Sequence, residues 1–545
     1  MNTLYFLVAL TPVLLVLFFL VILRLPATTA MPLSWLIHAL LAIFVWRMPL
    51  VQVTAASLEG IIIAGSVLWI IFGAIFLLNI LKTSGAILSI RTGFNQITAD
   101  RRVQAVLIAY LFGSFLEGAS GFGTPAAICA PFLVALGFPP LAAVVLSLVS
   151  NSIAVSYGSA GTTFLVGLTQ GLQQGVSAAP QVSLFLGQTS LNDFVRTAAA
   201  QTALLNLVPG IILPLVLSVM LTRFWGMNKS WREGLAIWKF ALLSGFIFAG
   251  SSALIAGLLG PDFPSLLGSM VALMVMIPIA RKGWLLPKKP WGFETDHINN
   301  LDLTSENLMP LSRAITPYIL ATIILLLTRL RFLPFKEWLN LVQVGWDQIL
   351  GTGISTSFAP IYSPGAIFTL AGLVSFYILK VNGNKMKTVL SNSAGNLFSS
   401  TIALGAAVPL VRIFINSGVN QIGLESMPIE LAASMALTLG SSWPLIAPFV
   451  GAMGAFISGS ATFSNLMFSL FQFGVAVENN LPPATIMALQ SAGAALGNMI
   501  CVVNVVAASS VVGLVGKEGK IIRFTLLPSL MMCLIAAIVA IILYI

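Results

Sequence analysis

Apolar segments long enough to cross a membrane recur along the whole chain, and short polar loops separate them. A transmembrane helix needs about 20 predominantly apolar residues. The pattern predicts about 12 crossings, at residues 4–23, 33–55, 60–82, 139–175, 193–222, 237–259, 263–280, 312–330, 364–380, 391–415, 484–514 and 523–545. We therefore expect an all-α polytopic membrane protein.

Two further apolar segments, 103–137 and 444–476, are interrupted at their centres by glycine, serine and threonine. Irregular backbone at membrane depth is tolerated only where protein buries it or where it lines a cavity. Each segment is therefore predicted to be a re-entrant hairpin, which enters and leaves the membrane on the same side.

Positive charge supports this layout. With the N-terminus outside and both hairpins re-entrant, all but six of the 26 Lys and Arg residues fall in inner loops, as the positive-inside rule requires. The exceptions are Arg47, Arg196, Arg329, Arg331, Lys336 and Arg412. If only one hairpin were a full crossing, every later loop would change sides and the bias would be lost.

The two interrupted segments also resemble each other. At an offset of about 340 residues, Gly113, Phe115, Gly118 and Phe122 correspond to Gly454, Phe456, Gly459 and Phe463. The charges make the first hairpin enter from inside and the second from outside. The sequence thus predicts two inverted repeats, a recurrent design of secondary transporters. They would comprise residues 1–222 and 312–545, with linker helices and a cytoplasmic loop in 223–311.

Composition narrows the class further. The chain is 58% hydrophobic and 8% charged, whereas soluble domains carry about 25% charged residues. Its net charge of +10 lies in short loops, so no nucleic-acid partner is expected. Cys129, Cys501 and Cys533 lie far apart and the two histidines form no cluster, so neither a metal site nor a cofactor is predicted. The first basic residue, Arg24, follows the first apolar run, which argues against a signal peptide.

Glu117 lies at the centre of the first hairpin, in the run FLEGASGFGTP. A carboxylate in hydrocarbon costs about 2.5–3.5 kcal/mol and marks a functional candidate. It is the only acid that the predicted crossings place clearly inside the membrane, and burial favours its neutral form. Glu117 is therefore predicted to carry a coupling proton, with capping of the broken backbone as the alternative. Arg412 is a weaker candidate, because it lies near an outer span end and can reach the surface.

Half-helices that begin inside the membrane expose N–H groups and a positive dipole end, which bind anions without Lys or Arg. Hydroxyl and amide side chains cluster at the same depth. The predicted substrate-binding residues are Ser120, Gly121, Gly123, Thr124, Ser460, Thr462, Ser464 and Asn465. Their counterparts in the crossings are Ser156, Ser159, Thr162, Thr163, Asn498 and Asn504. The set suits a small carboxylate that bears a hydroxyl group. No nucleotide motif is present, and an intramembrane enzyme or a channel is the alternative class.

At these residues the chain resembles the L-lactate permease family, which includes glycolate permeases. FLEGASGFGTPAAI resembles its EGAxGFGxP signature, and FISGSATFSNLMFSLFQ resembles its GSDTSSNALF-type signature. VVGLVGKEGKIIRFTL resembles the segment before the family's last span. The resemblance covers nearly the whole chain. It implies proton-coupled uptake of L-lactate or glycolate across a bacterial inner membrane. The signatures fall on Glu117, Gly118, Ser120, Gly121, Gly123 and Pro125, and on Gly459, Ser460, Thr462, Ser464 and Asn465.

One position departs from the family pattern, because the acid of the second signature is Ala461 here. Any coupling role of that carboxylate is therefore absent. Sodium coupling is kept as a variant, since hairpin carbonyls and hydroxyls can coordinate Na⁺. The sequence does not distinguish lactate, its enantiomer and glycolate, and it leaves open whether the chain forms a homo-oligomer.

Overall fold

The computed structural model of the chain describes residues 3–23, 25–95, 97–121, 123–293, 309–329, 333–514 and 517–545. These residues are mainly helical, with two small antiparallel hairpins, β1–β2 (Gln173–Gln174 and Ser177–Ala178) and β3–β4 (Val344–Trp346 and Thr356–Phe358). Nine helices in these ranges are long and apolar enough to cross a membrane, and one bent pair would make a tenth. The helical multi-pass class is confirmed, whereas twelve crossings, re-entrant hairpins and inverted repeats stay predictions.

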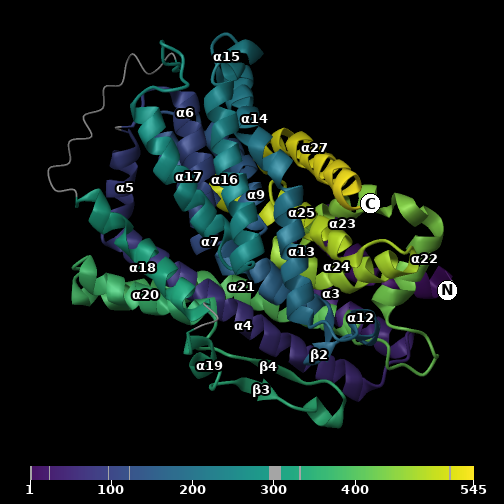
Figure 1. Cartoon of the computed structure of the whole chain (residues 1–545). Coiled ribbons are helices and arrows are strands. Elements are labelled where there is room, and N and C mark those ends of the chain that lie inside the picture. Colours follow the sequence, from purple (N-terminus) through teal and green to yellow (C-terminus); the bar gives the residue numbers. More distant parts are fainter. Residues whose placement is uncertain are drawn as a thin grey trace.

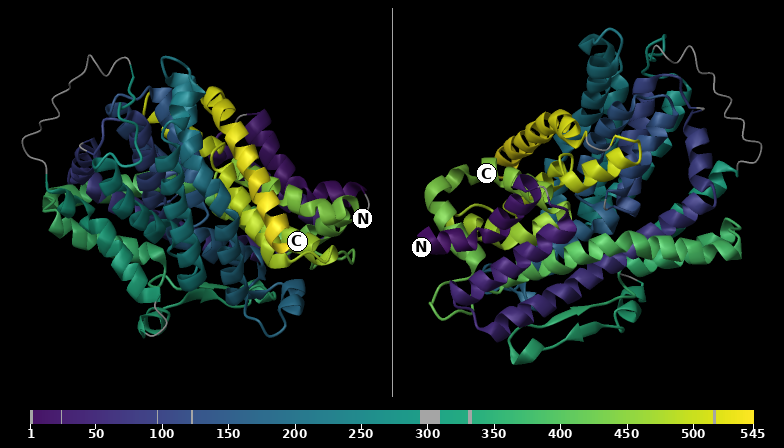
Figure 2. Two further views of the ribbon diagram at one scale, coloured as in Figure 1. Left: turned by 45° about the horizontal axis from the view of Figure 1, so that its top comes forward. Right: turned by 180° about the vertical axis from the view of Figure 1, so that it is seen from behind.

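Two long helices, α4 (Leu50–Thr83) and α21 (Met386–Ile415), pack against each other along one edge of the molecule (Figure 1). With α3 (Ala27–Phe44), α18 (Leu311–Arg329) and α20 (Pro364–Ile378) they form what we call the frame. The β3–β4 hairpin lies beneath α4 (Figure 2). At 1.5 Å per residue α4 is about 50 Å long, well beyond the ~30 Å of a hydrocarbon core. It must therefore tilt or project from the membrane.

Glycines allow the frame helices to approach closely. A Cβ atom at Gly60 of α4 would lie 2.4 Å from the Cα of Pro409 in α21. At Gly73 it would lie 2.2 Å from the carbonyl oxygen of Gly365 in α20. Contacts this short exclude any side chain, so these positions fix the helix–helix distance, as small residues commonly do in membranes.

The remaining helices form the core on the other side of α4 and α21 (Figures 1 and 2). In the first half they are α1 (Thr3–Ala9), α2 (Thr11–Leu17), η1 (Phe18–Ile22), α5 (Ala86–Asn95), α6 (Arg101–Ala105), η2 (Val106–Phe112), α7 (Gly113–Ala119), α8 (Thr124–Ala135), α9 (Pro140–Val155), α10 (Gly158–Thr162), η3 (Thr163–Leu168), α11 (Thr169–Gly171), α12 (Pro180–Leu186), α13 (Leu191–Leu205), α14 (Leu207–Trp225), α15 (Trp231–Leu235), α16 (Trp238–Leu259) and α17 (Pro264–Arg281). In the second half they are α22 (Met427–Leu439), η7 (Gly440–Ser442), α23 (Trp443–Ser458), α24 (Ala461–Glu478), α25 (Pro483–Gly497), α26 (Val502–Ser510) and α27 (Glu518–Tyr544). Short connecting elements are α19 (Phe335–Leu339), η5 (Ile349–Gly351) and η6 (Gly383–Lys385).

The boundary between the second and third predicted crossings differs from the structure. Residues 33–55 are predicted as one crossing, but α3 ends at Phe44 and α4 begins at Leu50, directly after Pro49. Proline disfavours helical backbone in the residue before it, which explains the break. As a result Glu59, which was assigned to a loop, lies inside α4. His297 of the predicted cytoplasmic loop lies outside the described residues.

Both interrupted segments reverse direction at the predicted places. In the first, the Cys129 thiol on α8 lies 3.5 Å from the carbonyl oxygen of Ile108 in η2. In the second, the Ser464 hydroxyl on α24 donates to the carbonyl of Gly451 on α23 at 2.7 Å. Each segment is therefore a pair of helical arms packed side by side and joined by a tight tip.

A buried ion pair joins the two long frame helices. Arg412 on α21 pairs with Glu59 on α4, and both side chains are 0% exposed. Glu59 also accepts a hydrogen bond from Asn416 at 2.8 Å, and Arg412 donates to the backbone carbonyl of Gln170 in α11 at 2.8 Å. The expectation that Arg412 reaches the membrane surface is therefore wrong. Glu117 is therefore not the only buried carboxyl group in the apolar segments, because Glu59 lies inside the long helix α4.

Breaking this ion pair should destabilise the protein more than removing it does. Glu59→Leu or Arg412→Met alone leaves the partner charged and buried, which typically costs about 3–5 kcal/mol. The double variant has no charge left to strand and should recover most of that loss. Thermal denaturation of the purified protein in detergent would measure the difference. A double variant no more stable than the less stable of the two single variants would contradict this account.

Candidate functional site

The tip of the first hairpin depends on two glycines in left-handed backbone. Helix α7 ends at Ala119, and α8 begins at Thr124 after Gly121 (φ 60°) and Gly123 (φ 75°). This conformation costs glycine nothing but strains other residues. A Cβ atom at Gly123 would also lie 2.4 Å from the Asn504 side-chain oxygen. Phe122 and the Thr124 side chain lie outside the described residues.

The tip of the second hairpin is shorter. Helix α23 is followed by Gly459, again in left-handed backbone (φ 81°), and Ser460 precedes the first residue of α24. The Ser460 hydroxyl accepts a hydrogen bond from the backbone N–H of Phe463 at 3.5 Å, the usual role of a helix N-cap serine. Both tips therefore end one helix and start the next within a few residues.

Two crossings are interrupted beside these tips. Between α9 and η3 the chain makes a left-handed turn at Ser159 (φ 47°), Ala160 (φ 53°) and Gly161 (φ 73°). Non-glycine residues cost roughly 1–2 kcal/mol each in this conformation, so packing must hold the turn in place. Between α25 and α26 the break spans 498–501, where Asn504 donates to the side chain of Asn498 at 2.6 Å.

One cavity of about 1260 Å³ lies where the four interruptions meet. Six predicted site residues line it, and four residues of the bent crossings do so as well: Glu117, Ser120, Gly121, Gly123, Ser460 and Thr462, with Ser159, Thr163, Asn498 and Asn504. The cavity extends to residues 25–28 at the start of α3 and to Glu518 at the start of α27. The two hairpin tips, far apart in sequence, thus face a common space.

The electrostatics of this cavity come from backbone and from carboxyl groups. No Lys or Arg is among the described residues that line it, and its two acids are Glu117 and Glu518. Helices α8, α24 and α26 all begin at its wall. Their first N–H groups and positive dipole ends attract anions. The three helix starts therefore offer a small anion N–H donors and positive dipole ends without a cationic side chain.

Glu117 is buried deep in the cavity wall, with 3% of its surface exposed. One carboxylate oxygen accepts a hydrogen bond from the Asn151 amide of α9 at 2.7 Å. The other faces Gly158, where a Cβ atom would lie only 2.3 Å from it. The carboxylate is thus held between a donor on one side and, on the other, a glycine whose missing side chain leaves room for it.

Ser464 and Asn465, which the sequence predicts to bind substrate, do not line the cavity. Ser464 accepts from Gln490 at 3.1 Å and donates to Gly451. Asn465 donates to the carbonyl of Thr163 and to the Ser491 hydroxyl, both at 3.1 Å. These side chains join the second hairpin to its neighbours behind the cavity wall.

Asn151 was missed as a partner of Glu117. The only signal for it was the run SNS at 150–152 inside an apolar crossing, and nothing in the sequence shows which of these three residues faces α7. Ser159 and Asn504 were identified as polar residues of the crossings, but their contacts with the first tip depend on the bends.

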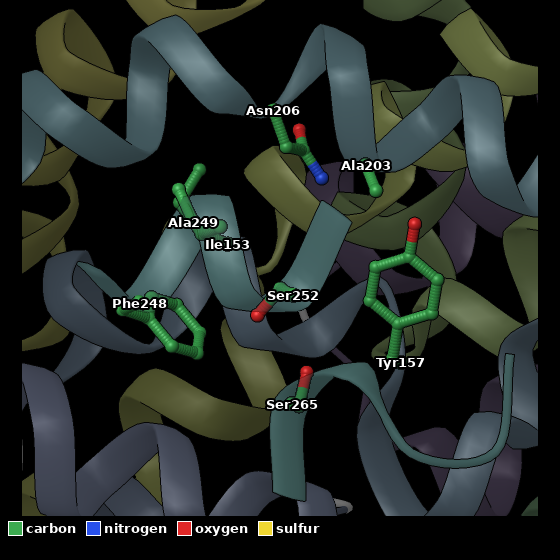
Figure 3. A pocket seen from close by; sticks show the side chains of 8 residues that line it. All are labelled: Ile153, Tyr157, Ala203, Asn206, Phe248, Ala249, Ser252 and Ser265. Carbon is green, nitrogen blue, oxygen red and sulfur yellow. The ribbon is translucent and has the colours of Figure 1, made fainter. Parts of the chain in front are cut away.

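A second, much smaller cavity of about 10 Å³ lies beside the first bent crossing (Figure 3). Asn206, Ser252, Ser265 and Tyr157 surround it with polar groups. It has room for about one water molecule, which excludes even a two-carbon acid. The large cavity is therefore the candidate substrate site.

Apolar helices that are interrupted around one cavity are typical of a membrane permease. The chain belongs to the L-lactate permease family, whose model matches residues 5–545. It is therefore a multi-pass inner-membrane protein.

Relatives of this chain are named as transporters. It is 28% identical over 575 residues to the L-lactate permease of Bacillus subtilis, with 98% of this chain and 94% of that protein covered. It is 28% identical over 571 residues to the glycolate permease GlcA of Escherichia coli, with the same coverage. Among solved structures, the YdaH transporter of Alcanivorax borkumensis matches with a TM-score of 0.40 and 12% identity, over 87% of this chain and 84% of that one.

Substitution of Gly158 tests whether the placement of the Glu117 carboxylate matters. Gly158→Ala puts a Cβ atom 2.3 Å from that oxygen, so the carboxylate must leave its place beside Asn151. Losing a hydrogen bond to a charged group corresponds to a roughly 10- to 150-fold slower rate. We expect the initial rate of lactate or glycolate uptake to fall by this factor, while the amount of protein in the membrane stays unchanged.

Gly250→Ala in α16 is the matched control, because a Cβ atom there meets nothing within 4 Å. It should transport normally. Normal uptake by Gly158→Ala as well would show that the position of the carboxylate is not critical.

Proposed function

We propose that the protein is a secondary active transporter that takes up L-lactate or a related 2-hydroxymonocarboxylate together with a proton. A preference for glycolate, or coupling to sodium, is the alternative within the same class. The observation that carries the proposal is the meeting of two hairpin tips and two bent crossings around Glu117 in one cavity. The names of the relatives support the substrate class.

The cavity supplies what a hydroxy acid needs. The substrate carboxylate would meet the N–H groups that begin α8 and α24, and its hydroxyl group would meet Ser460 or Thr462. Thr462 lines the cavity, and its hydroxyl group makes no hydrogen bond within the described part of the chain. A hydroxyl group without a partner at the wall is suited to a ligand, because the bond to it replaces only water.

The count of charges in the cavity supports proton coupling. An ionised Glu117 and a substrate anion would together bring two negative charges into the cavity. Moving a net charge across the membrane potential costs about 2.3 kcal/mol per 100 mV. A proton on Glu117 would cancel one of these charges. Ala461 lines the same cavity, so the position where the family signature has an acid contributes only a methyl group.

The shape of the cavity supports an inward-facing state. It reaches residues 25–28 and Glu518, and the topology predicted from the Lys and Arg distribution has both segments on the inner side. Substrate would leave along this route, and opening towards the outside would require the two tips to rearrange.

Thr462→Val tests substrate recognition, because valine has nearly the same shape and lacks the hydroxyl group. If the substrate bonds to this group, KM should rise about 5- to 150-fold, as expected for the loss of a hydrogen bond of about 1–3 kcal/mol. Thr322→Val is the control, since that hydroxyl group bonds to its own helix in α18. Equal KM values for both variants in proteoliposomes would reject this contact.

Glu117→Gln tests coupling, because glutamine imitates the protonated carboxyl group permanently. The variant should still exchange internal for external substrate. It should lose accumulation driven by an imposed pH gradient, because it can no longer pick up or release a proton. The same vesicles with a sodium gradient test the alternative. If the variant still concentrates lactate or glycolate under a pH gradient, Glu117 does not carry the coupling proton.

A further inference from the structure

The partner of Glu117 is itself incompletely bonded. Asn151 donates to Glu117 at 2.7 Å through its amide nitrogen, and both side chains are 3% exposed. The amide oxygen of Asn151 is buried and has no hydrogen-bond partner within the described residues. Buried polar atoms are nearly always paired, so such an atom calls for an explanation.

An amide next to a carboxyl group can serve either of its protonation states. An ionised carboxylate only accepts hydrogen bonds, whereas a protonated carboxyl group also donates one. An asparagine presents a donor and an acceptor on opposite branches, and a half-turn about its last side-chain bond exchanges them. The oxygen without a partner is thus the acceptor that a protonated Glu117 would need.

We propose that Asn151 is a positioning residue that reverses its amide when Glu117 takes up a proton. With Glu117 ionised, the amide N–H donates to the carboxylate. With Glu117 protonated, the amide oxygen accepts the carboxyl O–H. The proton enters from cavity water and returns to it, and Asn151 neither gains nor loses one. This inference rests on the proposed proton coupling at Glu117.

Two hydroxyl groups lie one helical turn before these residues and on the same faces. They are Ser114 on α7 and Ser147 on α9, three and four positions before Glu117 and Asn151 respectively. Both hydroxyl groups are buried without a partner in the described residues. A hydroxyl group can donate or accept as required, and neither of these bonds to the Asn151 amide in this conformation.

Among the described residues on the elements packed against α7, no charged side chain hydrogen-bonds to Glu117. Their other titratable groups are Tyr110 on η2, Cys129 on α8, Tyr157 before α10, Asp262 before α17 and Tyr318 on α18. Helices α17 and α18 carry arginine only near their ends, at Arg281, Arg313 and Arg329. The hydrogen bond to the Glu117 carboxylate comes from the Asn151 amide, at 2.7 Å.

Asn151→Leu keeps the size of the side chain and removes both hydrogen-bonding roles. The ionised Glu117 then loses its donor, so protonation becomes easier. The pH of half-maximal uptake in proteoliposomes should rise by about one to two units, which corresponds to the loss of one bond to a charged group. Asn151→Ser, which keeps a donor and an acceptor, should shift it less. In a Glu117→Gln background, Asn151→Leu should not change the pH profile.

Asn206→Leu is the matched control. Asn206 is also buried, its amide oxygen also lacks a partner in the described residues, and its nitrogen donates to Ser156 at 2.8 Å. It does not bond to Glu117, so its variant should leave the pH of half-maximal uptake unchanged.

The outcomes separate this inference from the function on which it rests. If the wild type accumulates substrate under a pH gradient, Glu117→Gln does not, and the Asn151 variants keep the wild-type pH profile, then only the role of Asn151 is overturned. If Glu117→Gln still accumulates substrate, the proposed coupling fails and this inference fails with it. If Asn151→Leu does not reach the membrane, the pH of half-maximal uptake of Asn151→Ser is the test. A small rise supports the inference, and no rise overturns it.

Discussion

Backbone groups at membrane depth need hydrogen-bond partners, and this constraint shapes the whole molecule. A continuous helix satisfies them internally, whereas an interrupted helix exposes N–H and C=O groups that hydrocarbon cannot solvate. This chain interrupts its helices at two hairpin tips and two bent crossings and gathers all four around one cavity. The polar groups that would be costly against lipid thereby become the lining of the site.

The rest of the structure holds these interruptions in place. The second hairpin is joined to the first bent crossing by the bond from Asn465 to Thr163. The end of that crossing is held by Arg412, whose charge Glu59 balances inside the frame. The strained turn at 159–161 lies between the Glu117 tip and Pro261. A substitution in the frame can therefore affect the cavity through this crossing, which packs against both.

The sequence predicts the parts of this arrangement that leave a local pattern. Apolar run length gives the helices, and glycine with serine at mid-membrane gives the two tips. Contacts between distant segments leave no such pattern. The Glu59–Arg412 pair was missed because the break at Pro49 was placed some ten residues late, which put Glu59 in a loop. Likewise Ser464 and Asn465 have the composition of a site, but the rotation of α24 turns them towards α25.

The central claim is that both hairpin tips contact the same substrate molecule. Substrate protection of single cysteines introduced at Ser120 and at Ala461, one on each tip and both lining the cavity, tests it most directly. The cysteines would be labelled with a small thiol reagent in a background in which the buried Cys129, Cys501 and Cys533 do not react. The account predicts that lactate or glycolate slows labelling at both positions, with the same half-maximal concentration. Protection at one tip only, or at clearly different concentrations, would contradict it.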